Sequence, residues 1–252
     1  PALDVAVLNA GAADAQGNIY QGAMAMLGDA WEVAAAAKRN GGLVIVAVGR
    51  LCAGGMGPLL LESSMVDAIV LDPLLEQTLG APYSDPWAFL SLKQSADGPS
   101  KGGASGPSAT WTIDRGRHVT TVVNRLIRQT PIRHPIDHLL GRLGAIVCCR
   151  YLQRGARINV GTGLPEEVGA VLGLLGDAAV QPYNEGGALG GVSAPGAFFG
   201  AAILPTEIVS SAEVYRRLYT RLDCAVLGAL EVDETGDVNV SCREGLQAST
   251  RR

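Results

Sequence analysis

Short runs of branched apolar residues alternate with an alanine-rich stretch in the first part of the chain. The runs LDVAVL, LVIVAVG and VDAIVLD occupy residues 3–8, 43–49 and 66–72. Continuous apolar runs of this length are typical of strands that are covered on both faces of a sheet. Between the first two runs, the alanines of residues 21–39 favour a helix, which residues 40–42, Asn-Gly-Gly, bring to an end. The order strand, helix, strand predicts parallel strands joined by a helical crossover.

The second part of the chain repeats this mixture of elements. Residues 136–153 have the pattern of a helix, and ARINVG at 156–161 has that of a buried strand. A further helix is predicted to begin at Pro165, because proline suits the first helical position and Glu166 and Glu167 would face the positive end of the helix dipole. The pattern therefore predicts an α/β fold with largely parallel strands.

Between the two parts lies a segment of small residues. Residues 95–109 read SADGPSKGGASGPSA, a composition that buries almost no apolar surface and is typical of a flexible connector. We therefore predict a first domain over 1–94, a linker over 95–112 and a second domain over 113–252.

One segment of the chain is repeated. Residues 3–19, LDVAVLNAGAADAQGNI, align without gaps on residues 222–238, LDCAVLGALEVDETGDV. The shared aspartate and glycine near the end of each copy predict the same turn, in which Asp supplies a side-chain hydrogen bond and Gly a positive φ. Chance similarity between two buried strands is the alternative. If the repeat is real, one copy opens the first half and the other nearly closes the second, so we expect a central part of a longer protein. The fold class predicted is then two related, open, largely parallel α/β modules, each incomplete.

Composition excludes several classes of function. The net charge is −4, and no basic stripe with interleaved aromatic residues is present, so we expect no nucleic-acid partner. No apolar run approaches the roughly 18 residues of a spanning helix, so we expect no membrane partner. The first residues lack the pattern of a secretory signal, which favours a cytoplasmic location. The 5 cysteines and 3 histidines have no zinc-site spacing, so no metal site is expected.

A glycine-rich loop follows the strand predicted in the second half. Residues 158–165 read INVGTGLP, in which Gly161 and Gly163 allow a ligand to approach the backbone closely. The N–H groups at the start of the next helix could bind a carboxylate or a phosphate. A tight turn without any ligand explains the pattern equally well, and the loop matches neither the dinucleotide fingerprint nor the P-loop.

A second glycine-rich segment contains a single carboxylate. Residues 183–205 read YNEGGALGGVSAPGAFFGAAILP, with Glu185 set against Gly186-Gly187 and followed by Gly190-Gly191. A carboxylate among residues without side chains is open to a large substrate, and nearby backbone N–H groups can stabilise charge on a reacting carbonyl. This setting suits covalent catalysis. The alternative is that Glu185 caps a turn and the glycines serve tight packing.

These segments resemble the family I coenzyme A transferases, in the form that carries both modules in one chain. That family's second module has the motifs V-N-L-G-I-G-x-P, E-S-G-x-x-G-G-x-P-x-x-G and G-L-D-x-A-x-L-G-x-x-x-V-D-x-x-G-N-V-N-V. Their counterparts here, in the same order, are INVGTGLP (158–165), NEGGALGGVSAPG (184–196) and RLDCAVLGALEVDETGDVNV (221–240). Counterparts of the first module's motifs lie at 3–19, 41–51 and 63–78.

The resemblance implies that Glu185 is the catalytic nucleophile. It implies transfer of CoA from a short-chain acyl-CoA to a small carboxylic acid through glutamyl anhydride and glutamyl-CoA thioester intermediates. CoA is then a substrate, and no other cofactor and no metal are implied. Substrate and CoA contacts are expected at Gly161, Gly163, Gly186, Gly187, Gly190 and Gly191. A homo-oligomer is expected.

The chain departs from the pattern of the family at two points. Gly186 stands where the family commonly has serine. The family's glycine-rich segment after the V-N-V strand is missing, as is the opening strand of the first module. Arg50, Arg221 and Lys101 are candidate partners of the CoA phosphates, and solvated surface charges are the simpler interpretation of each.

Two other functions are compatible with the sequence. One is a non-catalytic fragment or paralogue that acts as an oligomer partner, since a sheet cut short leaves unpaired edges. The other is a sugar-phosphate isomerase or deaminase of similar fold, although no base or phosphate site for such a reaction is evident.

Overall fold

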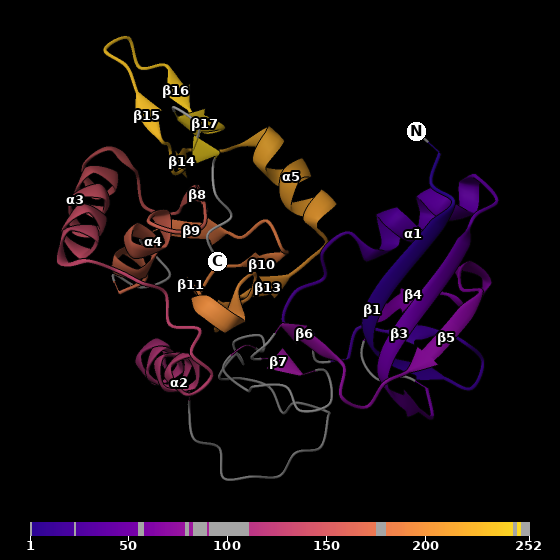
Figure 1. The fold of residues 1–252 in the computed structure, drawn as a ribbon. Helices are drawn as coiled ribbons and strands as arrows, with labels where there is room; N and C mark the ends of the chain where they lie inside the picture. The colour runs from indigo at the N-terminus through magenta and orange to yellow at the C-terminus, as the bar shows by residue number, and fades with distance from the viewer. Residues whose placement is uncertain are drawn as a thin grey trace.

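The structure, a computed structural model, describes residues 2–22, 24–54, 58–78, 81–82, 90, 111–174, 180–243 and 246–247. These residues form two halves that lie side by side, each built on a five-stranded sheet (Figure 1). We call residues 2–90 the first half and residues 111–247 the second half. The fold class is α/β, as predicted, and parallel strands occupy one side of each sheet while antiparallel strands occupy the other.

The sheet of the first half has the strand order β4-β2-β1-β3-β5. Its strands are β1 (Val5–Asp14), β2 (Ile19–Tyr20), β3 (Leu43–Cys52), β4 (Leu59–Leu61) and β5 (Ala68–Leu71). Strands β1, β3 and β5 are parallel, which confirms the three strands predicted from the apolar runs. Helix α1 (Ala30–Arg39) covers one face and buries Ala34 and Ala37 against valines of β3.

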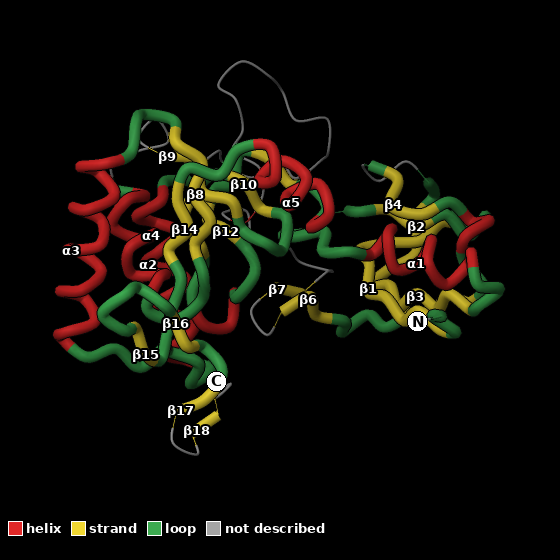
Figure 2. Tube along the Cα trace, turned by 90° about the horizontal axis from the view of Figure 1, so that it is seen from above, coloured by secondary structure: helices red, strands yellow, loops and turns green. Residues whose placement is uncertain are grey.

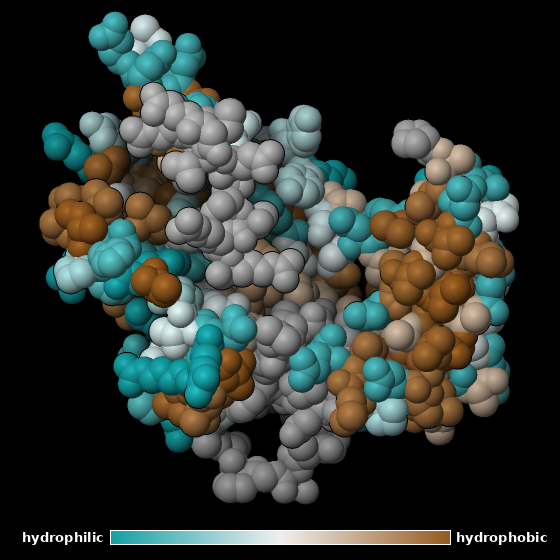
Figure 3. All heavy atoms as spheres, viewed as in Figure 1, coloured by the Kyte–Doolittle hydropathy of each residue, from teal (hydrophilic) through white to brown (hydrophobic). Residues whose placement is uncertain are grey.

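Two predictions for this half were wrong. The helix begins at Ala30. Residues 21–22 and 24–28 form an irregular loop, because this segment contacts the second half as described below. The strands are also not covered on both faces. Among the described residues, α1 packs on one face only, and Val5, Val7, Leu43 and Val70 on the other are 46%, 69%, 53% and 51% exposed (Figure 3). Apolar residues on both faces of these strands therefore do not imply that other described residues cover both faces of the sheet.

The sheet of the second half has the order β13-β10-β9-β8-β14. Its strands are β8 (Ala156–Val160), β9 (Val180–Tyr183), β10 (Ala188–Leu189), β13 (Glu207–Ile208) and β14 (Cys224–Val226). Strands β9, β8 and β14 are parallel, and β10 and β13 run antiparallel. Helix α4 (Pro165–Gly173) packs on this sheet, and α3 (Pro135–Tyr151) packs on α4. The predicted strand and both predicted helices are confirmed to within a few residues.

The remaining elements connect and decorate the two sheets. Helix α2 (Ile113–Leu126) and α5 (Ser211–Thr220) belong to the second half, and α5 lies on its side toward the first half (Figure 2). The short paired strands are β6 (Glu76–Thr78) with β7 (Ala81–Pro82), β11 (Val192–Ser193) with β12 (Ala202–Ile203), β15 (Glu231–Val232) with β16 (Val238–Asn239), and β17 (Cys242–Arg243) with β18 (Leu246–Gln247). No helix in the described part of the chain is both long enough and apolar enough to cross a bilayer.

The predicted linker lies outside the described residues, except for Trp111 and Thr112. The hydroxyl of Thr112 accepts a hydrogen bond from the backbone N of Arg115 and caps α2. The domain boundaries stay a prediction.

The two copies of the repeated segment form the same hairpin. The Oδ1 atom of Asp14 accepts a hydrogen bond from the backbone N of Asn18 at 2.9 Å, and Oδ1 of Asp233 accepts one from the backbone N of Asp237 at 2.9 Å. The glycine before each of these donors has a positive φ, +87° and +91°. The strands on either side also pair in the same register. The predicted turn is therefore confirmed in both copies, whereas the division into two modules stays a prediction.

Candidate active site

Two loops of the second half, one with Glu185 and one with Gly161 and Gly163, lie at the same edge of the second sheet. The chain leaves β9 after Tyr183 and enters the turn that carries Glu185, and it leaves β8 after Val160 and enters the loop with Gly161 and Gly163. Because β8 and β9 are neighbouring parallel strands, both loops follow the carboxyl ends of strands at the same edge. Open α/β sheets bind their ligands at this edge.

Glu185 lies in a tight hairpin turn between β9 and β10. The backbone N of Gly187 donates to the carbonyl oxygen of Asn184 at 3.0 Å, and the backbone N of Asn184 donates to that of Ala188 at 3.0 Å. The side-chain Oδ1 of Asn184 accepts from the backbone N of Gly186 at 2.9 Å. The side chain of Glu185 itself is exposed. A rigid turn therefore presents an accessible carboxylate.

The two glycines after Glu185 permit close packing of this turn. A Cβ atom on Gly187 would lie 2.0 Å from the carbonyl oxygen of Val209, and φ at this glycine is +112°. A Cβ atom on Gly186 would lie 2.9 Å from the carbonyl oxygen of Gly200 and 3.2 Å from Sδ of Met26. The packing role that the sequence left as an alternative is thus present beside the exposed carboxylate.

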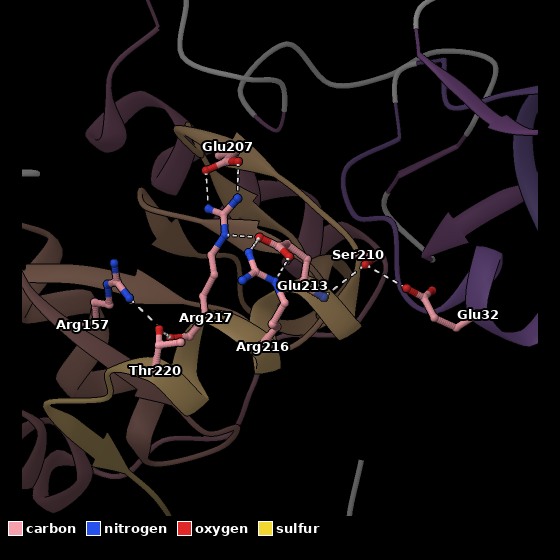
Figure 4. A network of polar contacts seen from close by, with 8 residues as sticks. All are labelled: Glu32, Arg157, Glu207, Ser210, Glu213, Arg216, Arg217 and Thr220. Atoms are coloured by element: carbon pink, nitrogen blue, oxygen red, sulfur yellow. Dashed lines mark hydrogen bonds and ion pairs between the residues drawn. The ribbon is translucent and has the colours of Figure 1, made fainter.

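The first half contributes directly to the site. The backbone N of Gly28 donates to the carbonyl oxygen of Gly186 at 3.1 Å, and the carbonyl oxygen of Gly28 accepts from the backbone N of Ser211 at 2.9 Å. Beside them, Oγ of Ser210 donates to Oε1 of Glu32 at 3.1 Å (Figure 4). The loop that replaces the start of the predicted helix therefore holds both the Glu185 turn and the start of α5.

Two side chains at this contact were not predicted from the sequence. The Oε2 atom of Glu32 is buried and has no hydrogen-bond partner among the residues that the structure describes. Tyr215 lies on α5, where burial and then the charge and hydrogen bonding of Glu185 raise the pKa of its hydroxyl, with a smaller effect from Asp29. The sequence carries no signal for this contact, because the segments meet only when the two halves pack together.

Asn159, a buried polar residue that was not predicted from the sequence, joins the two strands that lead into the site. Asn159 interrupts the apolar run of β8, and its Nδ2 donates to the carbonyl oxygen of Tyr183 at 3.2 Å. This bond joins the ends of the two strands that lead into the site. A polar residue within a buried strand was the available signal.

The glycine loop after β8 is held by an arginine. The Nη2 atom of Arg133 donates to the carbonyl oxygen of Gly163 at 2.8 Å and to Oε2 of Glu166 at 3.0 Å, while Nε donates to Oε1 of Glu167 at 3.0 Å. Burial raises the pKa of Glu166, an effect that Arg133 opposes. Two carboxylates thus already occupy the start of α4, which weakens the anion-binding interpretation of Gly161 and Gly163.

Gly190 and Gly191 lie away from Glu185. Both line a cavity of about 410 Å³ that Glu185 does not line. Arg217 also lines it, and its guanidinium pairs with Glu207 at 2.7 Å and with Glu213 at 2.6 Å (Figure 4). The structure therefore places two of the four predicted pocket glycines beside Glu185 and the other two at a separate cavity.

The three basic residues considered as partners of the CoA phosphates differ in their surroundings. Arg221 pairs with Asp223 at 3.0 Å, and Lys101 lies outside the described residues. The Nε atom of Arg50 is buried and has no hydrogen-bond partner in the described part of the chain, which differs from a fully solvated charge.

Comparison with known proteins shows that the chain is similar to CoA-transferases in sequence and in fold. No protein-family profile matches the chain. The chain is 26% identical over 246 residues to a caffeate CoA-transferase of Acetobacterium woodii, an alignment that covers 95% of this chain and 40% of that protein.

Solved structures show a likeness in fold. The apoenzyme of the acyl-CoA transferase YdiF of Escherichia coli O157:H7 is 22% identical, with a TM-score of 0.68, over 98% of this chain and 40% of that one. The thioester complex of the same enzyme with CoA is 21% identical, with the same TM-score and coverage. The chain therefore has the fold of part of an acyl-CoA transferase, and it spans about 40% of the length of the proteins it matches.

Proposed function

We propose that this chain is the part of a CoA-transferase that carries the catalytic nucleophile, Glu185. The observation that carries the proposal is an exposed carboxylate on a rigid glycine turn, at the carboxyl edge of the sheet and against the first half. The likeness to a caffeate CoA-transferase and to the fold of an acyl-CoA transferase supports it. The activity belongs to the whole protein of which the chain supplies this site.

In the proposed reaction a Glu185 oxygen attacks the carbonyl carbon of an acyl-CoA thioester. The C–S bond breaks, so CoA leaves as a thiolate and an acyl-glutamyl anhydride remains. The thiolate then attacks the glutamyl carbonyl, which releases the first carboxylate and leaves a glutamyl-CoA thioester. An acceptor carboxylate attacks this thioester to give a second anhydride, and the returning thiolate forms the new acyl-CoA and restores Glu185.

The turn around Glu185 fits this chemistry. The backbone N–H groups of Gly186 and Gly187 both donate to Asn184, which fixes the turn, so the backbone that carries the nucleophile is held in one place while the substrate enters from solvent. We propose acyl-CoA and small carboxylic acids as the substrates, with CoA as a substrate and not a resident cofactor.

The alternatives receive less support. A sugar-phosphate isomerase would need a base and a phosphate site, and the start of α4 is occupied by Glu166 and Glu167. A non-catalytic partner would not require an exposed carboxylate on a constrained turn. The cytoplasmic location stays a prediction.

The proposal is tested by isotope exchange in the full-length product of the gene that encodes this chain. Labelled acetate is incubated with acetyl-CoA, and label that enters acetyl-CoA is measured. We expect exchange in the natural protein and a loss of about a thousandfold or more in Glu185→Gln, because the amide is not a nucleophile. Glu234→Gln, an exposed glutamate on a distant hairpin, is the matched control and should exchange normally. Equal exchange by Glu185→Gln and the natural protein would refute the role of Glu185.

A further inference from the structure

Three segments converge on one backbone unit, Gly28. Its N–H binds the residue that follows Glu185, and its carbonyl oxygen binds Ser211 at the start of α5. Asp29 follows Gly28 directly, and Tyr215 lies four residues after Ser211 on α5. Residues four apart share one face of a helix, so Tyr215 and Ser211 lie on the same face. The hydrogen bonds of Gly28 therefore bring Glu185, Asp29 and Tyr215 together.

The groups that converge here have complementary hydrogen-bonding capacity. An ionised carboxylate only accepts hydrogen bonds, whereas a tyrosine hydroxyl can donate one. Tyr215 contributes the hydroxyl, and Glu185 and Asp29 contribute the carboxylates. The raised pKa of Tyr215 has burial as its first cause and Glu185 as its second, which agrees with this placement.

We propose that Tyr215 is a positioning residue for Glu185, whose carboxylate it orients by donating a hydrogen bond to one oxygen. The second carboxylate oxygen of Glu185 is then left free to attack a thioester. Rotation of the carboxyl group is restricted before the substrate arrives. The two halves are both required, because Gly28 of the first half fixes α5 relative to the Glu185 turn. The effect of Tyr215 on the reaction rests on the proposed function, whereas the contact between Tyr215 and Glu185 does not.

The contact is tested by NMR titration of the chain with ¹³Cζ-labelled tyrosine. Tyr215→Phe identifies the Tyr215 resonance by its loss. We expect Glu185→Gln to lower the pKa of Tyr215, because removal of a neighbouring negative charge makes the phenolate easier to form. Tyr219, which is 90% exposed on the same helix, serves as the internal control and should keep its pKa. An unchanged pKa of Tyr215 in Glu185→Gln would overturn the proposal.

The consequence is tested by the rate at which Glu185 acquires CoA in the full-length gene product. We expect Tyr215→Phe to slow this step about tenfold, the effect of one hydrogen bond, with KM for acetyl-CoA and thermal stability unchanged. Tyr219→Phe should react at the natural rate. A natural rate in Tyr215→Phe would overturn the positioning role. A changed NMR titration without any CoA adduct on the natural protein would instead contradict the proposed function while the contact stands.

Discussion

Glycine at positions 186 and 187 decides how closely the catalytic turn can pack. Cβ atoms at these two positions would meet backbone oxygens of Gly200 and Val209. The glycines that leave Glu185 accessible therefore also allow its turn to pack closely against the rest of the second half. The two interpretations that the sequence left open, an open carboxylate and a packed turn, are properties of one structure.

Substitution of Gly187 tests this packing. We expect Gly187→Ala to destabilise the chain by about 2 kcal/mol or more, since its Cβ would clash with Val209 and its positive φ strains any L side chain. Gly163→Ala is the control, because φ there is also positive, +83°, but no atom lies within 4 Å of the added Cβ. Urea unfolding measures both, and equal losses for the two variants would refute the packing argument.

Helix α5 contacts the first half, as the Glu185 turn does. Ser210 caps it by accepting from the backbone N of Glu213 at 3.2 Å, and the same hydroxyl donates to Glu32 of the first half. Near the other end of the helix, Arg217 forms ion pairs with Glu207 and Glu213. A single serine therefore serves both the helix and its placement beside the site.

The two roles of Ser210 can be separated by a second cap. Thr112 caps α2 in the same way, but its hydroxyl bonds to no residue in the described part of the first half. We expect Ser210→Ala and Thr112→Ala each to lose about 1 kcal/mol of stability from the cap, and Ser210→Ala to lose more, because Glu32 is left without a donor. Differential scanning calorimetry checks this, and an equal loss in both variants would show that the Ser210–Glu32 bond contributes nothing.

At this scale the sequence predicted well what depends on local pattern. Strands β1, β3, β5 and β8 follow apolar runs, and α4 begins at Pro165 as its proline and glutamates indicate, whereas the two-residue strands β10 and β13 have no such run and were not predicted. The start of α1 was predicted too early because the alanines and methionines of residues 21–28 favour a helix, whereas their contact with Gly186 favours a loop. Contacts such as Gly28–Gly186 join residues far apart in sequence, so no local pattern could reveal them.

The whole molecule carries an uncovered apolar surface, which we define by Val5, Val7, Leu43 and Val70. The strand register places these side chains on the same side of the first sheet, opposite α1 (Figures 1 and 3). All four are about half exposed or more. Exposed apolar patches of this kind mark association sites in soluble proteins. The resemblance in sequence implies a homo-oligomer, so we propose a second copy of this chain, related by a twofold axis, as the occupant of this surface.

Self-association of the chain is checked by sedimentation velocity. We expect the 252-residue chain to form a dimer, and Val7→Lys with Val70→Lys to shift it to a monomer, because two charges would face their copies. The control is Val232→Lys with Val238→Lys, two valines that are each 63% exposed on a separate hairpin. A monomeric natural chain, or a dimer that survives the first pair of lysines, would contradict this prediction.

The central claim is that Glu185 becomes covalently bound to CoA, and peptide mass spectrometry tests it most directly. The full-length gene product is incubated with acetyl-CoA, digested, and analysed with and without borohydride, which reduces a glutamyl thioester to the alcohol. The account predicts a CoA adduct on the peptide that contains Glu185, replaced by the alcohol after reduction and absent from Glu185→Gln. A protein that transfers CoA while this peptide remains unmodified, or an adduct that persists in Glu185→Gln, would contradict it.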